Sequence, residues 1–123
     1  MKKAALRDLT IDQLVDQFKD RAIEQDRALL MDEIGKVNRL FDELEDVEAE
    51  LKARNADERR ALLRLYDHSN TQVQVKAAKA TLAVAPAEAR LKLKSIRESG
   101  KYPQAGEAGM SLRALEEGIF KPT

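Results

Sequence analysis

His68 is the only histidine of the chain, and it follows Asp67 in a short polar segment, so this pair could do acid–base chemistry. General acid–base catalysis needs a partner group within hydrogen-bonding reach. Adjacent side chains at a turn usually point apart, so we expect a turn or capping role for His68. The alternative is a small-molecule-binding or enzymatic pocket between helices near Asp67 and His68.

Charged residues gather in two further sets. The acidic set is Asp42, Glu43, Glu45, Asp46, Glu48 and Glu50. The basic set is Lys76, Lys79, Arg90, Lys92, Lys94, Arg97 and Lys101. Paired carboxylates can bind a divalent ion, but consecutive acids on a helix spread around its polar face. We therefore interpret the acidic set as a solvated face, with a docking surface for a basic partner as the alternative.

Other chemistry finds little support in the residue types. The chain has no cysteine, so neither a disulfide framework nor a thiolate metal site can form, and one histidine leaves only carboxylates as further ligands. Gly106 and Gly109 lack the preceding strand and the following Lys-Ser/Thr of a phosphate-binding loop, so small residues at this spacing more simply let another helix approach. No nucleophile-elbow pattern is present. We expect no metal, no cofactor and no enzymatic activity.

The net charge is zero but is unevenly distributed. Residues 1–61 carry 12 Lys and Arg against 16 Asp and Glu, a net −4, and residues 62–123 carry 10 against 6, a net +4. This asymmetry indicates either two solvated faces or a partner surface, including a head-to-tail homo-oligomer. With five aromatic residues, we expect no nucleic-acid binding. No apolar run approaches the roughly 20 residues that span a bilayer, so we expect a cytoplasmic protein that does not enter a membrane.

Strong helix formers and the near absence of period-2 alternation predict an all-α protein of five or six helices. The expected helices cover residues 10–30, 32–52, a short stretch after residue 57, 71–84, 86–100 and 103–117. Thr10 begins a capping box, Asp57 is an expected N-cap, Pro86 suits a first helical turn and Gly118 suits a left-handed stop. No proline marks the break between the first two helices, which we place between residues 26 and 35.

Residues 67–86 read D-H-S-N-T-Q-V-Q-V-K-A-A-K-A-T-L-A-V-A-P, which predicts an Asn-capped helix with valine and alanine on its inner positions. Alanines at this density let neighbouring helices approach on two sides. Such a helix is typical of the inner helix in a stacked helical-repeat protein. A weak echo at an offset of 33 residues, which places 77–82 on 110–115, agrees with that interpretation.

The order of Asp67, Val73, Val75, Lys76, Ala77, Ala78 and Leu82 resembles the inner helix of a HEAT repeat, with departures at Ala80 and Thr81. The chain also resembles a family of short bacterial proteins classified as a domain of unknown function. The matching segments are 38–41, 65–86, 103–110 and 117–123. The resemblance implies an α-α superhelix of the armadillo/HEAT type and implies no activity.

We therefore expect residues 1–9 to be an N-terminal tail and residues 10–123 to be a single helical-repeat domain. The expected function is a non-enzymatic protein-binding or scaffold module, with an immunity-protein-like role as a specific version by fold analogy. The basic side chains of the Val/Ala helix would face a concave surface that docks one protein partner. The expected partner-binding residues are Gln72, Lys76, Lys79, Arg113 and Glu116.

Overall fold

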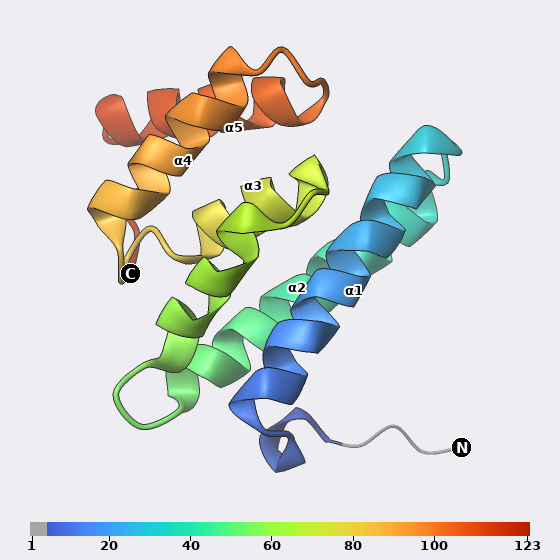
Figure 1. Ribbon diagram of the computed structural model, residues 1–123, viewed down its shortest axis with the longest axis vertical. Coiled ribbons are helices and arrows are strands. Elements are labelled where there is room, and N and C mark those ends of the chain that lie inside the picture. The colour runs from blue at the N-terminus through green and yellow to red at the C-terminus, as the bar shows by residue number, and fades with distance from the viewer. Residues whose placement is uncertain (1–4) are drawn as a thin grey trace. The chain divides into compact units, whose positions relative to one another are not determined.

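The computed structural model describes residues 5–123, which form five α-helices and two 3-10 helices and no strand (Figure 1). The elements are η1 (Leu6–Asp8), α1 (Ile11–Leu30), α2 (Ile34–Ala53), η2 (Glu58–Asp67), α3 (Thr71–Ala80), α4 (Pro86–Glu98) and α5 (Gln104–Glu116). The predicted all-α class is confirmed. The chain divides into two compact units, residues 1–61 and residues 62–123.

The first unit is built on a helical hairpin in which α1 and α2 pack side by side (Figure 1). The capping box at Thr10 is present: its hydroxyl accepts from the Gln13 amide at 3.1 Å, and the Gln13 side chain accepts from the Thr10 amide at 2.9 Å. The two helices bury leucines, valines and Phe18 between them. The Gln25 side chain also donates to the Val37 carbonyl at 3.2 Å, which joins the helices near the turn.

The turn between α1 and α2 falls inside the predicted range. Met31 ends α1, and Asp32 adopts a positive φ of 57°, which reverses the chain without a glycine or a proline. Aspartate tolerates this left-handed conformation better than most residues, which explains why no strong breaker is needed.

The predicted N-terminal tail covers residues 1–9, and its first four residues lie outside the described part of the chain. Its described part contains η1, and the carbonyls of Leu6 and Leu9 accept from the Arg54 guanidinium at 3.1 and 2.8 Å. Arg54 is itself fixed by Glu50 at 2.6 Å. This stretch is therefore anchored to the end of α2.

The short helix expected after residue 57 is η2, a 3-10 helix rather than an α-helix. Asp57 does act at its start, because its carboxylate accepts from the Arg59 amide at 3.3 Å. The buried positions of η2 are Arg59, Leu62 and Leu65, three residues apart, as 3.0 residues per turn requires. An α-helical period predicts Ala61, Leu62, Leu65 and Tyr66 as the buried stripe of this segment; Leu62 and Leu65 are buried, whereas Ala61 and Tyr66 are half-buried.

The second unit contains α3, α4 and α5, and α3 contacts both of the other helices. The prediction of neighbours on two sides of the Val/Ala helix is thus confirmed within this unit. Asn70 caps α3 by accepting from the amides of Gln72 and Val73 at 2.9 and 3.2 Å. Small and branched side chains of α3 meet leucines and isoleucines of α4 and α5 in one core.

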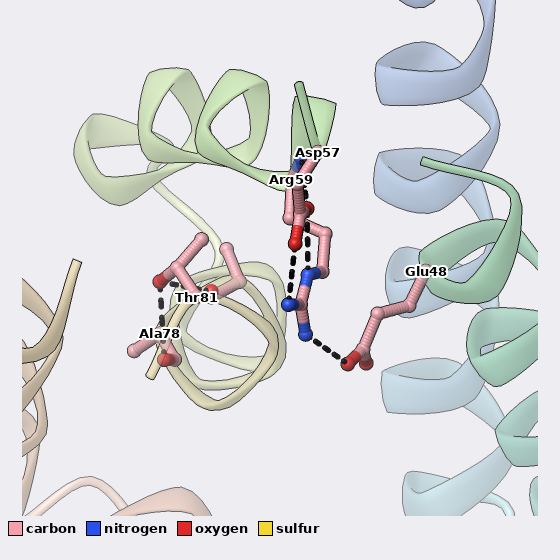
Figure 2. A network of polar contacts seen from close by, with 6 residues as sticks. Glu48, Asp57, Arg59, Ala78 and Thr81 are labelled. Carbon is pink, nitrogen blue, oxygen red and sulfur yellow. Dashed lines mark hydrogen bonds and ion pairs between the residues drawn. The ribbon is translucent and has the colours of Figure 1, made fainter. Parts of the chain in front are cut away.

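The end of α3 differs from the prediction, because the helix stops at Ala80 and not at Val84. The Thr81 hydroxyl lies 3.2 Å from the Ala78 carbonyl (Figure 2). It also lies 2.9 Å from the Ala77 carbonyl, so both carbonyls are within reach of its proton. It also bonds the Tyr66 hydroxyl at 2.6 Å. A threonine that bonds the last carbonyls terminates the helix where the HEAT pattern has alanine.

The other expected helix ends are confirmed. Pro86 is the first residue of α4. Gly118 has a φ of 71°, and the amides of Gly118 and Ile119 donate to the carbonyls of Leu115 and Ala114 at 3.3 and 2.9 Å, which is a Schellman motif. The superhelical stacking of armadillo/HEAT type stays a prediction.

Candidate functional site

Two of the predicted partner-binding residues, Lys76 and Lys79, converge on one carboxylate of the neighbouring helix. Their ammonium groups lie 2.8 and 3.0 Å from Oε2 of Glu107 on α5. Lys76 is largely buried, and Lys79 and Glu107 are partly exposed. The two lysines therefore tie α3 to α5 within the second unit.

The electrostatics of this cluster favour the ionised carboxylate. Burial by itself would raise the pKa of Glu107, but the charges of Lys76 and Lys79 and their hydrogen bonds outweigh it, so the pKa is lowered from its ordinary value of 4.5. One carboxylate oxygen thus accepts from two ammonium groups.

Gln72, the third predicted residue, is 2% exposed, and its side chain lies inside the second unit. The amide of Gln104 on α5 donates to its Oε1 at 2.9 Å. Gln72, Lys76 and Lys79 share one face of α3, and that face meets α5. Gln104 and Glu107 were not predicted, although their spacing of three on one helix is the signal that could have paired them with the polar face of α3.

Arg113 and Glu116 lie on the exposed side of α5 near its end. The Arg113 guanidinium bonds the Glu117 carboxylate at 3.1 Å, an exposed pair one turn apart. The structure does not bring Glu116 into any contact with Lys76 or Lys79. The partner-binding role of the five residues stays a prediction.

His68 lies in the turn before α3, where its Nδ1 accepts from the Asn70 amide at 3.0 Å. Its carbonyl accepts from the Gln74 side chain at 2.5 Å. An Nδ1 that accepts a hydrogen bond places the proton of the neutral ring on Nε2. His68 thus has the turn role that the sequence predicts, and it holds the capping residue Asn70 in place.

A buried arginine that the sequence analysis did not single out organises the end of the first unit. Arg59 forms a two-pronged pair with Asp57, at 2.9 and 2.6 Å, and lies 4.0 Å from the Glu48 carboxylate (Figure 2). The hydrogen bonds from Arg59 lower the pKa of Asp57. The planar guanidinium suits this fork geometry. The position of Asp57 two residues before an arginine is the only sequence signal for the pair.

The acidic set of α2 is partly engaged within the first unit. Glu43 bonds Arg21 of α1 and Arg39 of α2, each at 3.1 Å. Asp42, Glu45 and Asp46 are exposed. In residues 5–123 no group of three histidines, cysteines or carboxylates is placed to hold a metal ion.

The two glycines of α5 have different neighbours. A β-carbon on Gly109 would lie 3.5 Å from the Arg97 side chain of α4, and one on Gly106 would lie 3.7 Å from the Tyr102 ring. Gly109 therefore lies against α4, as predicted for a small residue at a helix contact. Gly106 instead faces the loop before its own helix.

Large apolar side chains lie exposed at the turn between α1 and α2. Leu30 is 80%, Met31 65% and Ile34 58% exposed. We call these three residues the hairpin tip. Asp32 and Glu33, both exposed, lie between them in the chain. Contiguous exposed apolar side chains can mark an interaction site of a soluble protein.

The fold and these residues define a class of small all-helical proteins in which buried polar side chains join some of the neighbouring helices. No helix within residues 5–123 combines the length and the apolar character needed to cross a lipid bilayer. Residues 12–116 match the family described as domain of unknown function DUF2019. The chain belongs to this family.

A solved structure carries the same fold. The crystal structure of the protein RPA1889 from Rhodopseudomonas palustris CGA009 is 48% identical and superposes with a TM-score of 0.95. The match covers 98% of this chain and 100% of that chain. No curated protein matches the chain. The predicted membership in a family of unknown function is confirmed.

Proposed function

We propose that the chain is a cytoplasmic, non-enzymatic protein-binding module that contacts its partner through the hairpin tip. The exposure of Leu30, Met31 and Ile34 on adjoining positions carries this proposal. Burying a large apolar side chain stabilises a complex by about 1.5–3 kcal/mol. Leucine and methionine side chains at a turn can insert into a pocket of a partner without a rearrangement of α1 or α2.

The chemistry of the tip specifies the kind of partner. Asp32 and Glu33 lie between Met31 and Ile34 in the chain and are exposed, so a complementary surface is an apolar pocket with cations on its rim. An immunity-type role, in which such a partner is a secreted toxin, is a special case that rests on fold analogy alone.

The positions of the polar residues also support a binding role over an enzymatic one. Lys76, Lys79 and Glu107 engage each other, and the Nδ1 of His68 accepts from a backbone amide. These are the groups that a catalytic site would need to have available for a substrate. No contact in the second unit favours the alternative of a pocket near Asp67 and His68.

Photo-crosslinking in the source cells tests the proposal. A photoreactive amino acid replaces Met31 in one strain and Met110, which is also largely exposed and lies on α5, in a matched control strain. We expect one discrete adduct with a different protein from position 31 only. The adduct should disappear when Leu30→Ser and Ile34→Ser are added, since both leave the probe in place.

Adducts of equal yield from positions 31 and 110, or no adduct from position 31, would contradict the proposal. An adduct that survives the Leu30→Ser and Ile34→Ser changes would contradict it as well, because the tip side chains would then contribute nothing to binding.

A further inference from the structure

One face of α4 carries three exposed cations at helical spacing. Ala89, Leu93 and Ile96 of α4 are buried in the core of the second unit. Arg90, Lys94 and Arg97, four and then three residues apart, lie on the exposed side. We call these three residues the basic stripe. The side-chain stem of Arg97 lies against Gly109, and the residue as a whole is exposed.

A matching face of opposite charge lies on α2 in the first unit. Leu40, Leu44, Val47 and Leu51 are buried against α1. Asp42, Glu45 and Asp46 lie on the exposed side, three and four residues from Asp42. We call these three residues the acidic stripe.

Neither stripe is neutralised by the described part of the chain. Within residues 5–123, no ion pair and no side-chain hydrogen bond engages any of the six residues. Their neighbours on the same helices behave differently: Glu43 and Glu50 of α2 are both paired with arginines. Like charges three or four residues apart on a helix repel each other, so each stripe costs its own helix stability.

We propose that the basic stripe of one copy of the chain docks on the acidic stripe of a second copy. Three cations on α4 meet an equal number of carboxylates on α2, so each stripe relieves the repulsion within the other. A large exposed apolar residue borders each stripe, Leu91 on α4 and Phe41 on α2, and the two can meet at the edge of the contact. The two stripes share no residue with the hairpin tip.

A second copy fits these observations better than a nucleic acid does. The complementary stripe is part of the same chain, whose two halves carry −4 and +4. A phosphate backbone would be attracted by the second unit and repelled by the first. Surface ion pairs are individually weak and are screened by salt, so the self-association is expected to be weak and to depend strongly on ionic strength.

Sedimentation equilibrium of the whole chain at two ionic strengths tests the first consequence. At about 0.01 M salt, where charges act over about 30 Å, the mass should rise with protein concentration above that of a monomer. At about 1 M salt, where charges act over about 3 Å, the association should weaken at least about tenfold. A monomer at every concentration in low salt would overturn the proposal.

Two charge-reversal variants test which surfaces meet. The first carries Arg90→Glu, Lys94→Glu and Arg97→Glu, and the second carries Asp42→Lys, Glu45→Lys and Asp46→Lys. Each variant alone has two stripes of the same sign and should be monomeric in low salt. An equimolar mixture should associate again, because the reversed stripe of each variant matches the native stripe of the other.

The control variant reverses three exposed cations outside α4, through Arg7→Glu, Arg27→Glu and Lys121→Glu, with the same change in net charge. It should associate as the wild type does. Circular dichroism checks that every variant is folded. A mixture of two folded variants that stays monomeric, or a control that loses association, would overturn the proposal. If the wild-type chain is monomeric and binds single-stranded DNA, and if reversal of the basic stripe abolishes this binding, then the stripe binds nucleic acid and the proposal is overturned.

Discussion

Gly109 lies inside α5 with helical backbone angles and with Arg97 of α4 at ordinary contact distance from where a β-carbon would be. Alanine is more favourable than glycine in a helix interior by about 0.5–1 kcal/mol, because glycine loses more backbone freedom on folding. We therefore predict that Gly109→Ala raises the free energy of unfolding by about 0.5 kcal/mol. Urea denaturation followed by circular dichroism measures this change.

Gly118 is the matched control, because its φ of 71° lies in the left-handed region that disfavours a side chain. Gly118→Ala should lower the free energy of unfolding by about 1 kcal/mol. If Gly109→Ala destabilises the protein as Gly118→Ala does, then the Arg97 stem packs too tightly on α5 to leave room for a β-carbon.

At the level of single residues, the sequence predicted the features that depend on hydrogen bonds between near neighbours in the chain. The Thr10 capping box, the Asn70 cap and the Gly118 stop depend on neighbours within three or four positions. The partner of Lys76 and Lys79 lies 31 and 28 residues away in the sequence, so no local pattern identifies it. The burial of Gln72 was missed for the same reason.

The helix α3 depends on its cap, because Asn70 satisfies two backbone amides at its first turn. We predict that Asn70→Ala lowers the free energy of unfolding by about 1 kcal/mol, whereas Asn70→Asp, which keeps the accepting oxygen, costs much less. Thermal unfolding of both variants measures the difference. Equal losses in the two variants would mean that the His68–Asn70 turn, and not the side-chain cap, begins the helix.

The contact between α3 and α5 makes stability depend on pH. The pKa of Glu107 is lowered by Lys76 and Lys79 in the folded chain and returns to about 4.5 on unfolding. The folded state therefore binds fewer protons, so this stabilisation is fully present above pH 4.5 and is lost as the pH falls below it.

Glu107→Gln should remove that contribution while it preserves the shape of the side chain. We predict a loss of about 1 kcal/mol at neutral pH, since the cluster is partly exposed, and a smaller difference from the wild type in acid. Urea denaturation at about pH 7 and about pH 3 tests both parts. A difference between wild type and variant that does not change with pH would mean that the two lysines do not hold Glu107 in its ionised form.

At the level of elements, helix content and most boundaries follow from hydrophobic period and capping residues. The type of one helix and the end of another could not be predicted without tertiary contacts. The segment Glu58–Asp67 is a 3-10 helix whose buried positions repeat every three residues, with Arg59 buried among leucines because Asp57 and Glu48 supply its countercharges. The helix α3 stops four residues early because Thr81 bonds its last carbonyls and the Tyr66 hydroxyl.

At the level of the whole molecule, the two units carry opposite charge, and each leaves a charged helix face exposed. Family membership and the all-α class could be predicted from the sequence, since both are carried by patterns along most of the chain. The hairpin tip could not, because Leu30 and Ile34 have the residue types and spacing of buried positions. Leu30 and Ile34 are exposed because α1 ends at Leu30, so both lie beyond the contact between α1 and α2.

The central claim is that the hairpin tip binds a protein. The most direct test is to measure the dissociation constant between the purified chain and the partner that crosslinks at position 31. Loss of two large apolar contacts should weaken binding by at least about tenfold, since about 1.4 kcal/mol corresponds to a factor of ten. We predict this loss for the Leu30→Ser, Ile34→Ser variant and an unchanged dissociation constant for Met110→Ser. Equal affinities of wild type and the tip variant would contradict the claim.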